Sequence, residues 1–369
     1  MKKFLYILII FILLLSSVAI LIMQQSKFGK APSGKRLERI KESPNYINGS
    51  FRNKSLTPVF SGGASYLSIT KEMLFEKKER VTPADGLPSV KTDLLHLDEN
   101  KDILVWFGHS SYFIQIDGKR ILVDPVFSSY ASPFSFSIKA FKGTSPYTTD
   151  DIPDIDYLFI THDHWDHLDY ESCLKLKSRI RKVVCGLGVG EHLEHWGFNT
   201  DSIVEMDWNE NANLDPGFVV HALPARHFSG RGIKRNQTLW ASFLFQTPTL
   251  KLFLGGDGGY DKHFAEIGKK FGPIDIAILE NGQYNTNWRY IHLLPEDLLK
   301  AFHDLNAKRL FTVHSSRFAL SNHAWDEPLT KVTARCKELN IPLITPMIGE
   351  EVNLEDSTKT FPEWWKGIE

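Results

Sequence analysis

Residues 161–169 read Thr-His-Asp-His-Trp-Asp-His-Leu-Asp, and no other segment restricts the fold of this chain as strongly. The apolar run 157–160 before it is typical of a buried strand, and the residues after it are typical of a helix. The segment is therefore predicted to be a strand-to-helix loop, held in place by rigid elements on both sides. So many imidazoles and carboxylates close together would be costly to desolvate in a structural role, whereas a divalent metal ion satisfies them jointly. The sequence predicts a metal-binding loop.

Further metal ligands are predicted at the ends of later strands, because one loop cannot complete two open metal sites. His227, Asp257 and His314 each follow an apolar run of the kind that forms a strand. Two glycines stand on each side of Asp257, and they permit tight turns and a close approach of the backbone to a ligand. Each residue alone reads as a turn or capping residue. In this order after the loop, all three are predicted ligands.

Residues 101–369 are predicted to form one α/β domain. Strands come first and then alternate with helices, which favours packed sheets with helices on their outer faces. Asp117-Gly118 is predicted to be the turn of a hairpin. The predicted strands are 103–107, 112–116, 120–123, 157–160, 182–185, 219–223, 239–245, 250–254, 274–279 and 310–313. The predicted helices are 168–177, 263–271, 295–305 and 328–339.

Residues 1–23 are predicted to be a single-pass membrane anchor. Between residues 4 and 23 there is no charge, and this run has about the ~20 residues that a bilayer-spanning helix needs. The alternative is a cleaved signal peptide, because Ser17-Val18-Ala19 has small residues at positions compatible with cleavage. Lys2 and Lys3 favour an exported domain, whereas the basic residues between 27 and 41 favour the opposite orientation. An extracytoplasmic hydrolase domain is predicted.

Residues 24–100 are polar and contain turn-forming pieces such as Ala31-Pro32-Ser33-Gly34, so they are predicted to be a tether and lead-in. The basic part of this segment would either lie against anionic lipid head groups or be solvated.

The charge balance argues against one class of partner. The chain has 43 Lys and Arg against 44 Asp and Glu, so no overall positive field attracts nucleic acid, and none is expected as a partner. Three widely spaced cysteines form no metal-type pair and are predicted to be small core residues. An oligomeric partner is not predicted.

The pattern of ligands resembles the metallo-β-lactamase superfamily, through the HxHxDH motif of residues 162–167 and the later His227, Asp257 and His314. Within that superfamily, residues from about 106 to 351 resemble the N-acyl-phosphatidylethanolamine-hydrolysing phospholipase D family. The segments that carry this resemblance are Gly108-His109-Ser110-Ser111, 122–128, 161–169, 266–273, 292–297 and 314–322.

The resemblance implies an αββα sandwich with two zinc ions at one edge, preceded here by the N-terminal transmembrane segment. His162, His164 and His227 would hold one ion, Asp166, His167 and His314 would hold the other, and Asp257 would bridge them. A water or hydroxide between the ions would be the nucleophile. His109 and Asp124 would support the metal ligands.

The implied function is a zinc-dependent hydrolase that cleaves a phosphodiester in a phospholipid-like substrate, with Asp166, Asp257 and His292 as catalytic residues. His292 and Arg317 are the predicted substrate contacts. Arg317 departs from the family, which has Trp-Gly-Thr-Phe where this chain has Ser-Ser-Arg-Phe at residues 315–318, and it could neutralise a phosphate or bridge surface carboxylates. His292 could instead be an ordinary loop histidine.

Two other functions remain open at this stage. One is a lactonase that resembles the ascorbate-6-phosphate lactonases of the same superfamily, in which the hydroxide attacks an acyl carbon. The other is a non-catalytic, metal-binding uptake component. The expected partners are a lipid or small phosphodiester substrate and the membrane.

Overall fold

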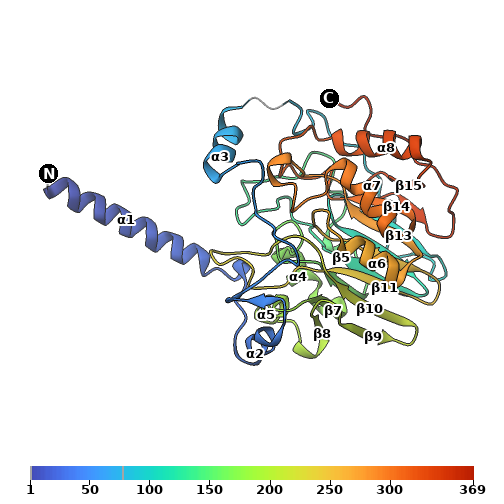
Figure 1. The fold of residues 1–369 in the computed structure, drawn as a ribbon, viewed down its shortest axis with the longest axis horizontal. Helices are drawn as coiled ribbons and strands as arrows, with labels where there is room; N and C mark the ends of the chain where they lie inside the picture. The colour runs from blue at the N-terminus through green and yellow to red at the C-terminus, as the bar shows by residue number, and fades with distance from the viewer. Residues whose placement is uncertain (1, 77–78) are drawn as a thin grey trace.

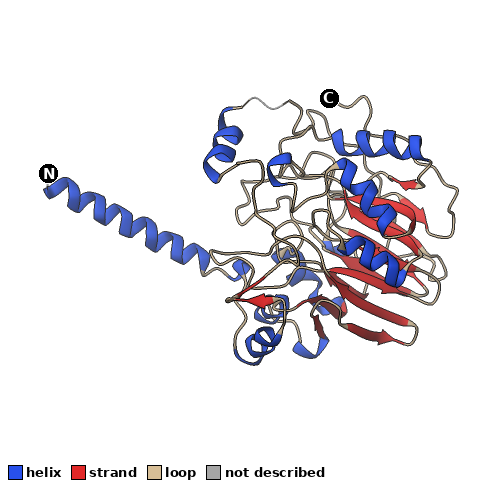
Figure 2. Ribbon diagram, viewed as in Figure 1, coloured by secondary structure: helices blue, strands red, loops and turns tan. Residues whose placement is uncertain are grey.

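Two seven-stranded β-sheets form the centre of the protein in the computed structural model, which describes residues 2–76 and 79–369. The sheets pack face to face, and helices lie on their outer faces, so the layers follow the order αββα (Figure 1, Figure 2). Phe159 of one sheet packs on Phe243 of the other inside the buried core between them. The predicted αββα sandwich is confirmed.

The first sheet has the strand order β16-β3-β4-β5-β6-β7-β8. Asp117 and Gly118 join β4 to β5 with positive φ angles of 49° and 69°, as a two-residue hairpin turn requires. From β5 to β8 the neighbouring strands run parallel. The strands are β3 (Ile103–Trp106), β4 (Tyr112–Ile116), β5 (Lys119–Val123), β6 (Ile155–Ile160), β7 (Ile180–Gly186), β8 (Ile203–Met206) and β16 (Glu351–Asn353).

The second sheet has the order β15-β14-β13-β12-β11-β10-β9, and its strands β12 to β15 run parallel. Its strands are β9 (Asn211–Asp215), β10 (Phe218–Leu223), β11 (Ser242–Gln246), β12 (Lys251–Leu254), β13 (Ile274–Glu280), β14 (Ala307–Val313) and β15 (Leu343–Ile344). Within these two large sheets, the strands that the sequence did not predict are β8, β9, β15 and β16, which are the edge strands. Edge strands are short or polar, so they lack the apolar run that marks an inner strand.

The four predicted helices are present, and each covers one sheet. α4 (Tyr170–Leu176) packs on the first sheet, together with α5 (Val189–His195), which was not predicted. α6 (His263–Phe271), α7 (Pro295–Asp304) and α8 (Glu327–Leu339) cover the second sheet. α7 begins with proline and two acidic residues, which suit the first turn of a helix.

α1 (Lys2–Met23) projects from the body of the molecule (Figure 1). Among the described residues it is the one helix that is long and apolar enough to cross a membrane, and none of its most apolar window is buried. By length and composition, an anchor and a signal sequence satisfy this test equally.

Much of the polar lead-in is part of the folded domain rather than a tether. Ile40 in α2 (Gly34–Glu42) and Phe51 in β2 (Ser50–Phe51) are fully buried in the core between the sheets. Arg36 forms ion pairs with Glu191 and Glu205 of the domain. The remaining elements here are the 3-10 helix η1 (Ser26–Phe28), β1 (Tyr46–Ile47) and α3 (Tyr66–Phe75).

Candidate metal centre

The predicted ligands meet at one edge of the sandwich because they follow the carboxyl ends of strands. The loop 161–169 follows β6, His227 follows β10, Asp257 follows β12, and His314 follows β14 directly. Parallel strands bring their carboxyl ends to the same edge of a sheet, and ligands of such sheets bind there. The fold therefore collects residues that are up to 152 positions apart, from His162 to His314, in one buried cluster.

His162, His164 and His227 form the first group. His164 Nδ1 lies 2.9 Å from His162 Nε2 and 3.2 Å from His227 Nε2. His227 Nδ1 is 2.8 Å from the carbonyl oxygen of Ile291, to which it donates, so its Nε2 is left with a lone pair for this group. Burial holds the pKa of His162 and of His227 well below the usual value, so both rings are neutral, as metal binding requires.

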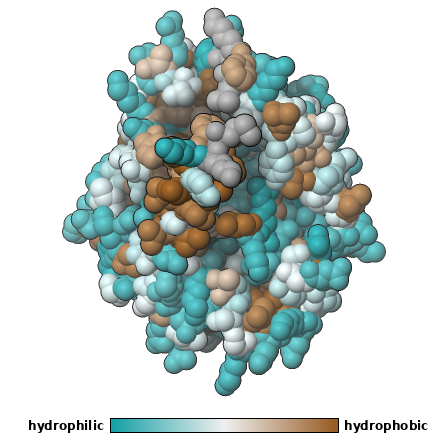
Figure 3. Space-filling model, turned by 90° about the vertical axis from the view of Figure 1, so that its left-hand side faces the viewer, coloured by the Kyte–Doolittle hydropathy of each residue, from teal (hydrophilic) through white to brown (hydrophobic). Residues whose placement is uncertain are grey.

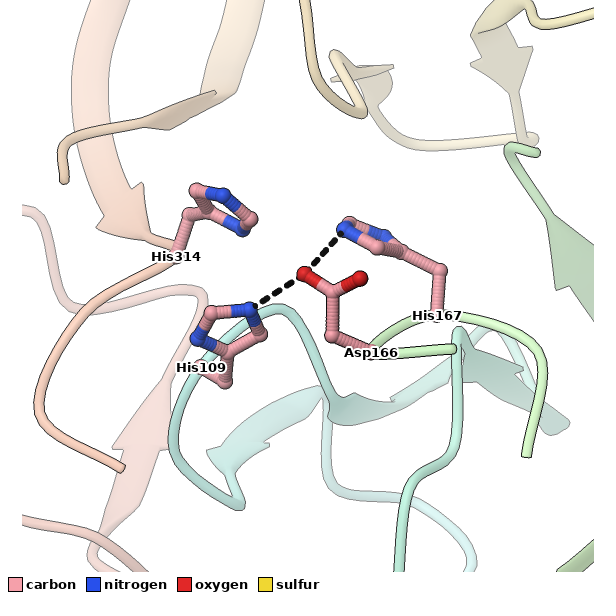
Figure 4. Close-up of side chains that lie close together, drawn as sticks. All are labelled: His109, Asp166, His167 and His314. Atoms are coloured by element: carbon pink, nitrogen blue, oxygen red, sulfur yellow. Dashed lines mark hydrogen bonds and ion pairs between the residues drawn. The ribbon is translucent and has the colours of Figure 1, made fainter. Parts of the chain in front are cut away.

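His109, Asp166, His167 and His314 form the second group (Figure 4). Asp166 Oδ2 lies 2.9 Å from His109 Nε2 and 3.4 Å from His167 Nε2. Burial alone would raise the pKa of Asp166, but the charge of His167 and the hydrogen bonds with His109 and His167 together hold that pKa well below its usual value. The structure thus adds His109 to the residues predicted for this group.

Asp257 lies between the two groups. Its Oδ2 is 3.2 Å from His167 Nε2 and 3.9 Å from both His162 Nε2 and His227 Nε2. Its Oδ1 is 3.2 Å from His314 Nδ1. The carboxylate therefore lies within 4 Å of ligand atoms from both groups, which is the geometry that a bridging role needs.

The donor set fits divalent metal ions. The buried atoms His167 Nε2, His314 Nε2 and Asp257 Oδ1 have no hydrogen-bond partner, although unpaired buried polar atoms are rare. Burial would lower the pKa of His167, but Asp257 and Asp166 raise it well above the usual value. The two carboxylates therefore favour a positive charge beside the His167 ring. A divalent ion supplies that charge and satisfies the unpaired nitrogens and oxygen together.

Asp124 supports the loop 161–169, which we call the metal loop, through hydrogen bonds to two of its residues. Asp124 Oδ2 lies 2.8 Å from His167 Nδ1, and Asp124 also accepts hydrogen bonds from the backbone and hydroxyl of Thr161. Asp124 and His314 both have positive φ angles, 41° and 69°, which is strained for residues with a side chain. The predicted supporting role of Asp124 agrees with these contacts.

Asp124→Asn is expected to weaken metal binding by ~10- to 100-fold, because the amide holds the His167 ring less firmly in the orientation and tautomer of a ligand. Metal affinity measured by competition with a chelator checks this, with Asp201→Asn, an exposed carboxylate, as the matched control. An unchanged affinity in Asp124→Asn would show that His167 is oriented by other contacts.

His292 lies at the wall of a cavity of about 280 Å³ that reaches the metal centre. Its Nδ1 is 2.6 Å from Glu280 Oε2, and Glu280 also accepts from the backbone N–H of Gly258. Burial alone would lower the pKa of His292, but Glu280 raises it to about 9. Glu280 therefore fixes the ring of His292 at the cavity and favours its protonated form.

The structure does not bring Arg317 to the metal centre, and this corrects its expected contact with substrate. The side chain is buried, and it donates to the carbonyl oxygens of Phe107 and Ser128. Among the residues that the structure describes, it forms no ion pair with a carboxylate either. Ser316, with a φ of 62°, changes the direction of the backbone between His314 and Arg317.

Arg235 lines the cavity as a second positively charged side chain, and the sequence analysis did not predict it. Its guanidinium lies 5.1 Å from the ring centre of Phe228, which also lines the cavity. The available signal was the basic, glycine-containing segment 230–235 shortly after His227.

Comparisons with known proteins agree with this architecture. The sequence matches the family described as Beta-lactamase superfamily domain over residues 119–315. An uncharacterized protein of Mycobacterium tuberculosis is 36% identical over 88% of this chain and 88% of its own length. N-acyl-phosphatidylethanolamine-hydrolyzing phospholipase D 1 of Caenorhabditis elegans is 26% identical over 72% of this chain and 80% of its own. The structure of Igni18, a metallo hydrolase from Ignicoccus hospitalis, superposes with a TM-score of 0.52 at 21% identity, over 69% of this chain and 98% of Igni18, which shows a shared fold.

Proposed function

This chain belongs to the beta-lactamase superfamily and is a metal-dependent hydrolase, and we propose that it binds two zinc ions and cleaves a phosphodiester in a phospholipid-like substrate. One observation carries the proposal: an apolar cavity ends at the metal centre. Asp166, Asp257 and His314 lie at its polar end, and its other walls are largely apolar. The apolar side chains are Val59, Phe60, Tyr66, Phe228, Trp288, Ile291 and Leu320.

Such a cavity suits an amphiphile whose polar group lies at the metals and whose chain lies against apolar walls. A relative that acts on N-acyl-phosphatidylethanolamine supports the same substrate class. Arg235 stands beside the cavity and would attract the negative charge of a phosphodiester, the role first expected of Arg317.

Zinc ions held by these residues would lower the pKa of water and polarise the phosphoryl group. Among the chain's own residues, Asp257 and Asp166 supply negative charge that fixes the ions, and His292 holds a proton at the cavity wall. Because Nδ1 of His292 is engaged by Glu280, Nε2 is left to protonate the departing oxygen.

Metal analysis and a substrate panel test the proposal. We expect about two zinc equivalents per chain, and release of the head group from vesicles that contain N-acyl-phosphatidylethanolamine, lost on strong chelation. A ring-opened acid from a sugar-phosphate lactone, without phosphodiester cleavage, would instead identify a lactonase. Bound metal without turnover on either substrate would identify a binding component, and turnover after complete metal removal would reject the mechanism.

We further propose that α1 stays attached as the membrane anchor of an extracytoplasmic domain. Deletion of residues 1–23 is then expected to move the protein from the membrane fraction to the soluble fraction, because only α1 provides a bilayer-spanning length of apolar surface among the described residues. Metal content and activity on dispersed substrate should be preserved. A deletion variant that fails to fold would show that α1 is needed for more than anchoring.

A further inference from the structure

Residues 26–30 lie shortly after α1, which ends at Met23, and they form a strap that is hydrogen-bonded to the domain. Trp196 Nε1 donates to the carbonyl oxygen of Ser26 over 2.7 Å. The backbone N–H of Lys30 donates to His192 Nδ1 over 3.0 Å, and the other ring nitrogen of His192 lies 3.2 Å from Asp163 of the metal loop. The strap is thus held at both of its ends.

Arg231 joins the middle of the strap to the metal loop. It is almost fully buried, and its Nη2 donates to the carbonyl oxygen of Lys27 over 2.8 Å. Its Nη1 donates to the carbonyl oxygens of Asp163 and Leu168, on the metal loop, over 3.0 and 2.6 Å. Because these bonds fix the strap on the loop, the end of α1 has a defined place relative to the metal centre.

A second cavity, of about 520 Å³, connects that place with the metal centre. Met23, the last residue of α1, and Phe28 of the strap line this cavity, and His164 and Asp166 of the metal centre line it as well. An opening to the metal centre therefore begins at the base of α1.

Exposed apolar side chains surround this opening. Ile233 is 84% exposed, and it is next to Gly232, against which Met23 packs. Phe136 is 75% exposed and stacks on Phe134, whose ring centre lies 5.8 Å from Lys27 Nζ of the strap. Figure 3 looks onto the face from which α1 projects towards the viewer, and the hydrophobic side chains near its centre include those of α1 itself. Exposed apolar side chains in such a group mark an interaction surface.

We propose that this face docks on the bilayer that α1 enters, with Phe136 and Ile233 in the lipid and the opening of the second cavity at the membrane surface. This rests on the proposed function in that α1 is the anchor. A spanning helix of this length places Met23 at the interface, so residues packed beside Met23 lie at head-group depth. Lys27 and Lys234 add positive charge where anionic lipids attract it. A substrate with its chain in the bilayer would then reach the metal centre sideways, without leaving the membrane.

Site-specific fluorescence tests the docking without any substrate. The three native cysteines are buried, so a single cysteine at Ile233→Cys or Phe136→Cys in the full chain can carry a polarity-sensitive fluorophore. Leu339→Cys is the matched control, an apolar residue on α8 that is 41% exposed. The vesicles are phosphatidylcholine with about 30 mol% phosphatidylglycerol, which gives a negative surface potential. We expect the fluorophore at 233 or 136 to shift its emission to the blue and to be quenched by lipid-borne quenchers, and the fluorophore at 339 to show neither effect.

Co-sedimentation of the same samples with the vesicles distinguishes a failure of the docking proposal from a failure of the proposed membrane anchor. Protein that sediments with vesicles while the labels at 233 and 136 stay in water would overturn the docking proposal and leave the anchor intact. Equal shifts at all three positions would overturn it as well, because the contact would be unspecific. Protein that does not sediment would overturn both the anchor and the docking, whereas the metal content and the hydrolase assignment would be unaffected.

Discussion

Asp257→Asn is expected to lose at least one metal ion and to reduce turnover by several orders of magnitude. Asp257 is a carboxylate whose oxygens face both groups: Oδ2 lies 3.9 Å from His162 and His227 of the first group, and Oδ1 lies 3.2 Å from His314 of the second. The amide keeps the size of the side chain but removes its charge, and a neutral amide bridges two divalent cations poorly. Both metal positions are therefore disturbed by one substitution, and with them the activation of water.

Elemental analysis after dialysis, together with the turnover number, measures this effect. Cys173→Ala is the control, because Cys173 is buried behind the metal loop and has no donor atom at the centre. It should keep its metal and rate and cost about 1–3 kcal/mol of stability. If Asp257→Asn kept two metals and near-normal turnover, the bridge would have to be assigned to another carboxylate such as Glu280, which shares a possible metal group with Asp257 and His314.

His292→Gln is expected to lower kcat by ~10²- to 10⁴-fold on a phosphodiester with an alkoxide leaving group, while the metal content stays unchanged. An alkoxide leaves slowly unless it is protonated, and His292 is the protonated side chain at the cavity wall, with a pKa of about 9. A substrate with a p-nitrophenolate leaving group needs no such proton. On that substrate the variant should lose much less activity.

The comparison of the two substrates distinguishes proton donation from a structural role. His221→Gln, a substitution on β10 outside both groups, is the control and should leave both rates unchanged. An equal loss on both substrates, or a loss of metal, would contradict proton donation. It would instead favour His292 as a metal ligand with Asp257, Glu280 and His314, a group whose donor atoms also lie within 4.8 Å of one another.

The sequence predicted the parts of the site that depend on local order. His162, His164, Asp166 and His167 lie in one loop, so their proximity follows from their spacing. His227, Asp257 and His314 were predicted to join this loop because each follows an apolar run of the kind that forms a strand, and one loop cannot complete two metal sites. Inner strands and amphipathic helices were also predictable, since burial on one or both faces leaves an apolar pattern in the sequence.

Only the tertiary structure decided the contacts that depend on chain direction and on distant partners. Arg317 is next to the ligand segment in sequence, but the turn at Ser316 directs it to backbone carbonyls away from the cavity, while Arg235 from another loop stands there. The polar lead-in reads as a tether, yet Ile40 and Phe51 fill the core between sheets that form much later in the chain. A sequence pattern records whether a residue prefers burial, and it does not record which distant residue completes the contact, so these features required the fold.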